Sequence, residues 1–200
     1  MWTKVLPVGD AESVDTDVTE AETSPHRTAA PSGAERPDLV VVMGVAGSGK
    51  TTVAALLAGR MGAAFAEGDD FHSPANVEKM SAGTPLTDDD RWPWLGGIRD
   101  WLAERAAAGE SAVVPCSALR RAYRDLLREA GPVRFVHLTG SRELLSERIQ
   151  GRAGHFMKPE MLVSQLATLE PLADDEDGFA VGIDAKPAAL VDEILRRLGR

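Results

Sequence analysis

The stretch that most constrains this fold is residues 39–51. Leu39–Met43 is a continuous apolar run rich in β-branched residues, which is typical of a strand buried on both faces of a sheet. Residues 44–51 follow at once and read GVAGSGKT, which matches the pattern G-x-x-x-x-G-K-[ST] at every fixed position. A helical pattern begins at Lys50. This order predicts a phosphate-binding loop in an α/β domain; the alternative, a glycine turn that binds nothing, is disfavoured by the complete motif.

Each position of this loop has a chemical reason. Glycines let the backbone wrap closely around a phosphate and point several N–H groups at it, and the helix that follows presents its positive end. Lys50 is expected to reach the β- and γ-phosphates of ATP and to act in catalysis, and the hydroxyl of Thr51 is expected to bind Mg²⁺. The loop residues expected to bind the nucleotide are Gly44, Gly47, Ser48, Gly49, Lys50, Thr51 and Thr52.

Apolar runs and helical patterns alternate through the rest of the chain. Strands are expected at residues 39–43, 63–66, 113–114, 133–138 and 179–183, and helices at 50–61, 88–108, 120–130, 142–153, 159–169 and 187–198. Gly62 and Gly131 stand where the residue after a helix end is expected, and Pro187 suits a first helical turn. The alternation predicts an α/β fold whose mainly parallel sheet is covered by helices on both faces.

The net charge of −9 is distributed unevenly along the chain. Residues 1–38 hold three basic and eight acidic residues, which is more than half of the excess, and they show no helical or strand period after Val8. We therefore expect residues 1–38 to form a disordered acidic tail and residues 39–200 to form a P-loop kinase domain. The alternative for the tail is an acidic interaction arm.

Composition argues against several classes of protein. The negative charge disfavours a protein that binds nucleic acid or an anionic membrane. The chain has no apolar run of the roughly 18 residues that a transmembrane helix needs, and residues 1–10 lack the features of a signal peptide. The single cysteine, Cys116, excludes a disulfide scaffold and points to a reducing compartment, so we expect a cytoplasmic protein. Cys116 itself is expected to be a small buried apolar residue.

Two acidic residues, Asp69 and Asp70, follow the second expected strand. We expect that strand to lie beside the strand of residues 39–43, with its carboxyl end facing the ligand crevice. A carboxylate there can take the proton of an attacking hydroxyl, and Asp69 is the preferred base with Asp70 as second choice. The alternative is a solvated acidic turn that caps the next helix. Because the chain is short and has no Asn/Thr-Lys-x-Asp guanine-reading pattern, a small-molecule kinase fits best.

Several longer segments resemble one family. They read EGDDFHSPANVEKM (residues 67–80), GTPLTDDDRWPWL (83–95), CSAL (116–119), YRDLLR (123–128), GHF (154–156), MLVSQL (161–166) and TLEP (168–171). In this order they resemble the bacterial-type gluconokinase family of P-loop carbohydrate kinases, over a span from about Leu39 to the C-terminus.

The resemblance implies a fold like that of nucleoside monophosphate kinases with a mobile lid, and a homodimer. It also implies that ATP phosphorylates D-gluconate at its terminal hydroxyl to give 6-phospho-D-gluconate. One alternative is a kinase for another small polyol or acid, such as shikimate. An alternative of a different class is a nucleotide-dependent binding or regulatory module that has lost turnover, against which the intact Asp69 argues.

The same segments supply residues suited to a polyol that ends in a carboxylate. The expected substrate-binding residues are Asp69, His72, Asn76, Lys79, Arg91, Ser117 and Arg120. Asp88 is interpreted as a helix cap, since acidic residues suit a first turn, while Asp90 is a candidate site residue and Arg124 a weaker one. Ser73 separates His72 from Pro74, where the family often has histidine and proline adjacent, so this loop is expected to turn differently.

Arg148 and Arg152 are spaced i, i+4 and share one face of the helix expected at residues 142–153. In nucleotide kinases of this build such arginines flank a lid over ATP. We therefore expect Arg148 to bind the nucleotide and Arg152 to act in catalysis with Lys50 and Asp69. The alternative is a solvated basic face that pairs with acidic residues of the same helix. Three tryptophans are assigned to the core or to a subunit interface: Trp92, Trp94 and Trp101.

Overall fold

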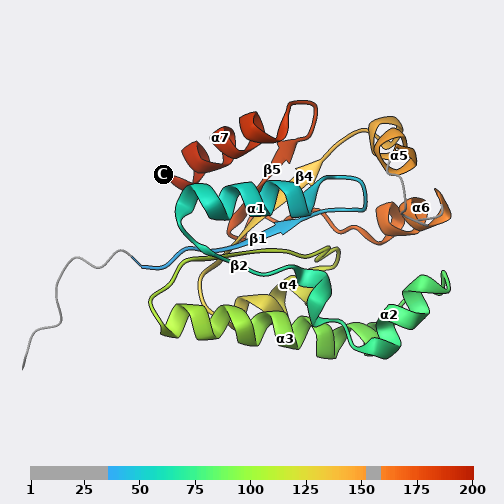
Figure 1. The fold of residues 1–200 in the computed structure, drawn as a ribbon, viewed down its shortest axis with the longest axis horizontal. Helices are drawn as coiled ribbons and strands as arrows, with labels where there is room; N and C mark the ends of the chain where they lie inside the picture. Colours follow the sequence, from blue (N-terminus) through green and yellow to red (C-terminus); the bar gives the residue numbers. More distant parts are fainter. Residues whose placement is uncertain (1–35, 152–158) are drawn as a thin grey trace, which may run out of the picture. The chain divides into compact units, whose positions relative to one another are not determined.

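Five parallel strands form the central sheet in the computed structural model, which describes residues 36–151 and 159–200 (Figure 1). The strands are β1 (Leu39–Met43), β2 (Ala64–Phe65), β3 (Ala112–Pro115), β4 (Val133–Thr139) and β5 (Gly178–Gly182). They lie in the order β2-β3-β1-β4-β5, and every neighbouring pair is parallel. The parallel sheet predicted from the sequence is thereby confirmed.

The position of β2 differs from the sequence prediction. We expected this strand beside β1, but β3 lies between them: Val113 pairs with Val40 on one side and with Phe65 on the other. The difference follows from burial, since all four residues of β3 are buried whereas β2 has two residues and its Phe65 is 40% exposed. A fully apolar strand suits the interior of a parallel sheet, and a short, partly exposed strand suits its edge.

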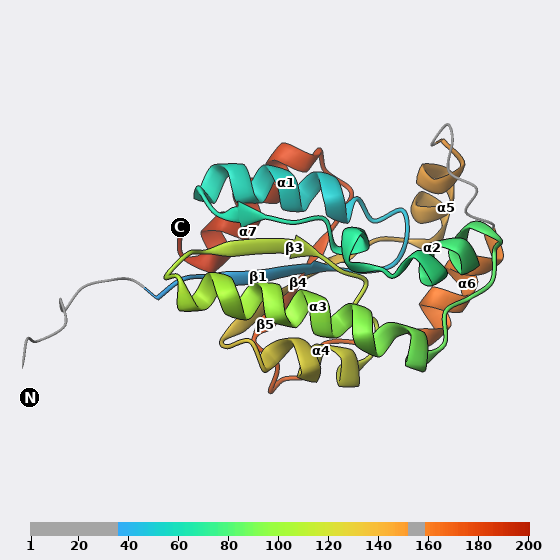
Figure 2. The same cartoon turned by 60° about the horizontal axis from the view of Figure 1, so that its bottom comes forward.

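Helices cover both faces of the sheet (Figure 2). They are α1 (Lys50–Met61) and α7 (Pro187–Leu198) on one face and α3 (Asp88–Ala107) and α4 (Arg121–Arg128) on the other. Alternate residues of β1 point to opposite faces, so that Val40 and Val42 join the core with α1 and α7, while Leu39 and Val41 join the core with α3 and α4. β1 is therefore buried on both faces, as its sequence predicts.

The sequence patterns missed two short elements between β2 and α3. A 3₁₀ turn, η1, spans Gly68–Phe71, and α2 spans Pro74–Ser81. Ser73 is the N-cap of α2, because its hydroxyl accepts a hydrogen bond from the backbone N–H of Asn76 at 3.2 Å and Pro74 occupies the first helical turn. The serine that separates histidine from proline is thus the residue that starts this helix.

The remaining helices agree with prediction to within a few residues. α5 (Arg142–Gln150) and α6 (Pro159–Thr168) flank residues 152–158, and those seven residues, with the lid and Arg152 predicted there, lie outside the described part of the chain. Residues 1–35 of the predicted tail also lie outside it. Asp38, assigned to that tail, is bonded into the fold: its N–H donates to the Ser111 hydroxyl at 3.0 Å. Within the described ranges, the structure has no helix of the length and apolarity needed to cross a membrane.

Candidate active site

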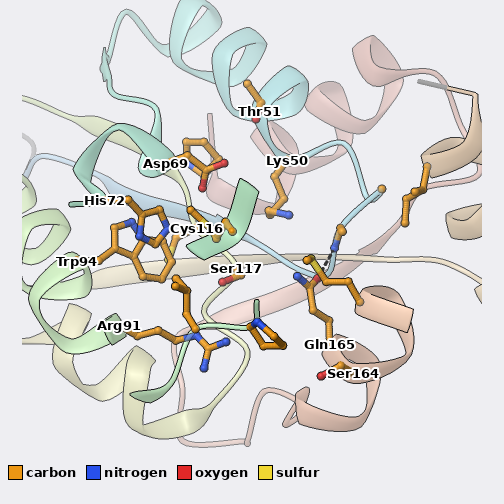
Figure 3. Close-up of a pocket in the computed structure, with 18 of the residues that line it drawn as sticks. Lys50, Thr51, Asp69, His72, Arg91, Trp94, Cys116, Ser117, Ser164 and Gln165 are labelled. Carbon is orange, nitrogen blue, oxygen red and sulfur yellow. Dashed lines mark hydrogen bonds between the residues drawn. The ribbon is translucent and has the colours of Figure 1, made fainter. Parts of the chain in front are cut away.

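A pocket of about 510 Å³ opens at the carboxyl edge of the sheet (Figure 3). Its lining comes from the loop between β1 and α1, the segments that follow β2 and β3, the end of α2, the first turns of α3, and α5 and α6. Parallel strands bring all these loops to one edge, which is where open α/β sheets bind ligands. The displaced β2 still delivers its loop to this edge, because β2 runs parallel to β3.

The phosphate-binding loop is held by its own side chains. Val45 O accepts hydrogen bonds from the Ser48 hydroxyl at 2.8 Å and from Lys50 Nζ at 3.1 Å. Gly47 has φ +80°, and a Cβ there would lie 2.8 Å from Leu145 O, so only glycine lets α5 pack against the back of the loop. The first turn of α1 has no acidic residue and no side-chain cap. Its N–H groups therefore point at an anion site without a competing protein carboxylate.

The predicted nucleotide-binding residues divide into two groups. Gly47, Gly49, Lys50 and Thr51 line the pocket, whereas Ser48 is fully buried beneath it. The N–H of Gly44 donates to Ser117 O at 3.3 Å, which ties the base of the loop to the segment after β3. Gly44, Ser48, Thr52 and Arg148 are absent from the described lining. Thr52 is exposed on α1, and Arg148 Nη2 donates to Ile183 O at 2.7 Å.

Asp69 lies in η1 and lines the pocket together with Lys50. The turn is pressed against the end of β3, since a Cβ on Gly68 would lie 1.9 Å from Pro115 O. Trp94 Nε1 donates to Gly68 O at 2.7 Å and fixes the same turn from α3. Asp70, the second choice for the base, is exposed and is not among the described lining residues. The structure thus brings Asp69, rather than Asp70, to the phosphate-binding loop.

Cys116 follows β3 and lines the pocket from below. It is 2% exposed, which agrees with the prediction of a small buried residue. Burial raises the pKa of its thiol to about 12, against a smaller opposing effect of Lys50. A thiol with this pKa stays protonated at neutral pH and is not a nucleophile.

His72 also lines the pocket, where its ring lies flat on Trp94 with 4.2 Å between centroids and 15° between planes. Burial lowers the pKa of His72 below its usual value, the charge of Arg91 lowers it further, and the charge of Asp69 opposes both. Its Nδ1 atom is buried without a hydrogen-bond partner in the described structure. A neutral imidazole can both donate and accept a hydrogen bond, so His72 is suited to bind a ligand hydroxyl.

Asp88 lies between two arginines, Arg91 and Arg120, in a charged cluster beside the pocket. It accepts hydrogen bonds from the Tyr123 hydroxyl at 2.5 Å, from Arg120 Nη1 at 2.5 Å and from Arg91 Nη1 at 3.5 Å. The bond from Tyr123, with the charges of the two arginines, lowers the pKa of the Asp88 carboxyl. Of this cluster, Arg91 lines the pocket, whereas Arg120, also predicted to bind substrate, is not among the described lining residues.

Asp88 lies in the first turn of α3, as predicted, but the acid that completes the capping box is Asp90, the candidate site residue, which is not among the described lining residues. Asp90 is the capping residue: its N–H donates to the Thr87 hydroxyl at 3.3 Å and its Oδ2 accepts from the Thr87 N–H at 2.9 Å. Lys79 pairs with Asp90 at 2.6 Å, and these contacts lower the pKa of Asp90 to about 2. A capping box needs the acid at the third helical position, and that position is residue 90.

Asn76 and Lys79, both predicted to bind substrate, are not among the lining residues of the described pocket. Asn76 is 5% exposed and its Nδ2 donates to Asp90 O at 2.7 Å. With the ion pair of Lys79 and Asp90, this contact fastens α2 to the start of α3. Ser117 does line the pocket, at the carboxyl end of β3.

Arg124, the weaker candidate, belongs to the protein interior. Its side chain is fully buried and forms a two-point ion pair with Glu176, at 2.5 Å and 2.8 Å. Its guanidinium also donates to Ala118 O at 3.1 Å and to Pro171 O at 3.2 Å. These bonds occupy Nε and both terminal nitrogens, so Arg124 joins α4 to the segment after α6.

Gln165 is a pocket residue to which the sequence patterns assigned no role. It projects from α6, and its Oε1 accepts a hydrogen bond from the N–H of Ala46 in the phosphate-binding loop at 2.7 Å. Trp94, assigned to the core or an interface, is 4% exposed and lines the pocket as the platform for His72. The only available signal for either residue was its place inside a segment of the family resemblance.

A divalent cation would have to be held mainly by ligand oxygens. Among residues 36–151 and 159–200, no group of three or more His, Cys, Asp or Glu side chains is arranged to bind a metal. Thr51, in the first turn of α1, supplies one hydroxyl at the pocket. This donor set fits Mg²⁺, which keeps several waters and binds together with substrate phosphates.

Comparisons with known proteins agree with the fold. Residues 39–172 match a family described as an AAA domain. The chain is 52% identical over 162 residues to a gluconokinase of Gluconobacter oxydans, covering 80% of this chain and 91% of that protein. It is 45% identical over 148 residues to the thermoresistant gluconokinase of Escherichia coli, covering 73% and 85%.

Two solved structures are similar at comparable identity. A gluconokinase from Sinorhizobium meliloti is 48% identical with a TM-score of 0.74, covering 82% of this chain and 93% of that one. An unliganded sugar kinase from Janibacter is 50% identical with a TM-score of 0.78, covering 82% and 95%. A shikimate kinase from Aquifex aeolicus, at 16% identity and a TM-score of 0.53, covers 80% and 95% and shares the fold alone.

Proposed function

Because this chain belongs to the gluconokinase family, we propose that it transfers the γ-phosphoryl group of ATP to the terminal hydroxyl of D-gluconate. The products are 6-phospho-D-gluconate and ADP. The observation that carries the proposal is the composition of one pocket, which is lined by the phosphate-binding loop, by Asp69 and by Arg91. These groups suit, in turn, a triphosphate, an attacking hydroxyl and a carboxylate.

The nucleotide end of the site is formed by the loop and the first turn of α1. Backbone N–H groups of the loop and the ammonium of Lys50 hold the β- and γ-phosphates. Mg²⁺, when bound through the Thr51 hydroxyl, supplies positive charge that neutralises phosphate oxygens. Lys50 begins hydrogen bonded to Val45 O, so its ammonium is already positioned at the mouth of the loop.

Asp69 is the base for the acceptor. Its carboxylate takes the proton of the terminal hydroxyl as the hydroxyl oxygen forms a bond to the γ-phosphorus and the bond from that phosphorus to the β-phosphate oxygen breaks. Because ADP leaves with the charge of that oxygen, Lys50 stabilises the leaving group as well as the transferring group. Arg152, the third catalytic residue predicted, lies outside the described residues.

The carboxylate end of the substrate is assigned to the cationic side of the pocket. Arg91 reaches the lining, and Asp88 and Tyr123 hold its guanidinium from behind. His72, kept neutral by burial, suits a hydroxyl in the middle of the polyol chain. Ser117 adds a small hydroxyl at the floor of the pocket. The polyol chain thus spans the pocket from Asp69 to Arg91.

Mg²⁺ dependence, a homodimer and a cytoplasmic location are further parts of this proposal. Thr51 supports the first, the family resemblance supports the second, and the single cysteine of the sequence supports the third.

The test is an ADP-release assay on the purified full chain with a panel of acceptors. The panel contains gluconate, other sugar acids, shikimate, and the neutral hexitol that differs from gluconate at the carboxylate. We expect gluconate to have the highest kcat/KM and the hexitol to be poor, with the phosphate placed on the terminal carbon by ³¹P NMR. Strong activity on another acid with none on gluconate contradicts the proposal.

A further inference from the structure

Gln165 makes a contact that connects α6 directly to the phosphate-binding loop. Its Oε1 accepts the N–H of Ala46 at 2.7 Å, across 119 positions of the sequence. Because a backbone N–H can only donate, this contact fixes which end of the carboxamide faces the loop. Figure 3 shows Gln165 extending from α6 toward the loop, and both residues line the pocket.

The contact uses only the carboxamide oxygen of Gln165, so the two N–H donors of the carboxamide nitrogen are not needed for it. Oε1 and Nε2 belong to one planar group, so fixing Oε1 on Ala46 also fixes Nε2 beside the loop. Ala46 is the third residue of the eight-residue motif that ends with Lys50 and Thr51. The transferring phosphoryl group has to lie between this loop and Asp69, and Gln165 lines the same pocket.

The helix that carries Gln165 is anchored on both sides of its pocket face. Leu162, one turn before Gln165, is 2% exposed in the core with α1 and α7. Beyond the end of α6, the N–H of Glu170 donates to Leu119 O at 2.7 Å, and a Glu170 carboxylate oxygen accepts the N–H of Arg121 at 2.5 Å. Gln165 is therefore held by packing and hydrogen bonds before any ligand arrives, as a preorganised donor requires.

We propose that Gln165 is a further catalytic residue, whose Nε2 donates a hydrogen bond to an oxygen of the γ-phosphoryl group while Oε1 holds Ala46. The inference rests on the proposed use of ATP. During phosphoryl transfer, negative charge is spread over the three outer oxygens of the moving group, and a fixed donor there stabilises the transition state. The hydrogen bond from Nε2 to the γ-phosphoryl group forms with ATP but not with ADP, because ADP has no γ-phosphoryl group.

Two substitutions separate this role from simple support of the loop. Gln165→Glu keeps an oxygen for the N–H of Ala46 but replaces the donor with a second, charged oxygen. Gln165→Met keeps the length of the side chain and removes both functions. The control is Ala167→Glu, which adds the same charge at an exposed position of α6 outside the described lining.

The readouts are the affinities for ADP and for a non-hydrolysable ATP analogue by calorimetry, kcat with the best acceptor, and a thermal melt. We expect Gln165→Glu to bind ADP within about two-fold of wild type, to bind the analogue at least about ten-fold more weakly, and to lose about 10²-fold in kcat. Gln165→Met should also lose affinity for the analogue relative to ADP, and Ala167→Glu should match wild type.

The proposal is overturned if the ratio of analogue to ADP affinity stays at the wild-type value in both variants. A loss of affinity for both nucleotides in Gln165→Met with none in Gln165→Glu would also overturn it, because Gln165 would then only support the loop. The nucleotide affinities need no acceptor, so they stand or fall separately from gluconate as the substrate.

Discussion

The hydroxyl of Tyr123 donates a 2.5 Å hydrogen bond to Asp88, which joins α4 to the first turn of α3 beside the pocket. Tyr123 is 2% exposed, and Arg91 contacts both partners, at 3.4 Å from the hydroxyl and 3.5 Å from the carboxylate. The pair therefore sets the position of the one arginine of this cluster that reaches the described lining.

Tyr123→Phe tests the role of this pair. The variant keeps the buried ring and removes one hydrogen bond to a charged acceptor, which is worth about 1.5–3 kcal/mol. Arg91 should be positioned less well, so KM for gluconate should rise on the order of ten-fold, while KM for ATP stays unchanged. Steady-state kinetics with each substrate varied in turn measure both constants. An equal rise in both would contradict a role confined to the acceptor side.

Asp69→Asn and Asp70→Asn form a matched pair on one turn. Loss of the base should lower kcat of Asp69→Asn by about 10²–10⁴-fold, since general base catalysis contributes that much. Asp70 is exposed and stands away from the described lining, so Asp70→Asn should keep nearly full kcat. ATP-analogue binding by calorimetry should be retained in both. Unchanged turnover in Asp69→Asn would remove Asp69 from its role.

Arg91→Met and Lys79→Met distinguish two cations of one segment. Arg91 lines the pocket, whereas Lys79 pairs with the capping residue Asp90 at 2.6 Å. Loss of Arg91 should therefore raise KM for gluconate much more than loss of Lys79. The neutral hexitol, which has no carboxylate, serves as the control acceptor, and steady-state kinetics with each acceptor measure KM. The opposite order would restore Lys79 as a substrate-binding residue.

The stability of the protein should depend on His72 as the pH falls below about 6.5. Burial lowers the pKa of His72 in the folded state, so the unfolded chain binds more protons as the pH falls below the ordinary value near 6.5. Above that pH, protonation of His72 does not change the free energy of unfolding. Below it, the free energy of unfolding decreases as the pH falls. The Tm of His72→Asn should thus fall less steeply with decreasing pH than the Tm of wild type. His137, whose pKa burial also lowers, accounts for part of the slope that persists.

Arg124→Met should destabilise the fold strongly without touching the pocket. Both side chains of the Arg124–Glu176 pair are fully buried, and loss of one partner leaves an uncompensated charge that costs about 3–5 kcal/mol. Urea unfolding measures the loss, which should shrink at low pH as Glu176 becomes protonated. The double substitution with Glu176→Leu should recover much of the stability; if it does not, the cost comes from packing and from the lost carbonyl contacts.

Local patterns in the sequence were enough for the phosphate-binding loop and for the elements other than η1 and α2. A period of two or 3.6 residues, or an eight-residue glycine motif, depends only on residues close together in the sequence. The strand Leu39–Met43 and the helix Lys50–Met61 accordingly have the predicted bounds. Asp69 was also chosen this way, because it lies a few residues after the second expected strand, and it lines the pocket. Asp88 and Asp90 show the limit: both are acidic residues of one first turn, and only the position of Thr87 decides that Asp90 completes the capping box.

The local patterns thus specify a parallel α/β fold with a complete phosphate-binding loop and an acid in the same pocket. The tertiary structure decided that β2 lies at the sheet edge, that Trp94 carries His72, that Arg124 is neutralised by Glu176 and that Gln165 reaches Ala46. These contacts join residues far apart in the chain. No local period encodes them, because they depend on which face of a helix meets which loop once the core has packed.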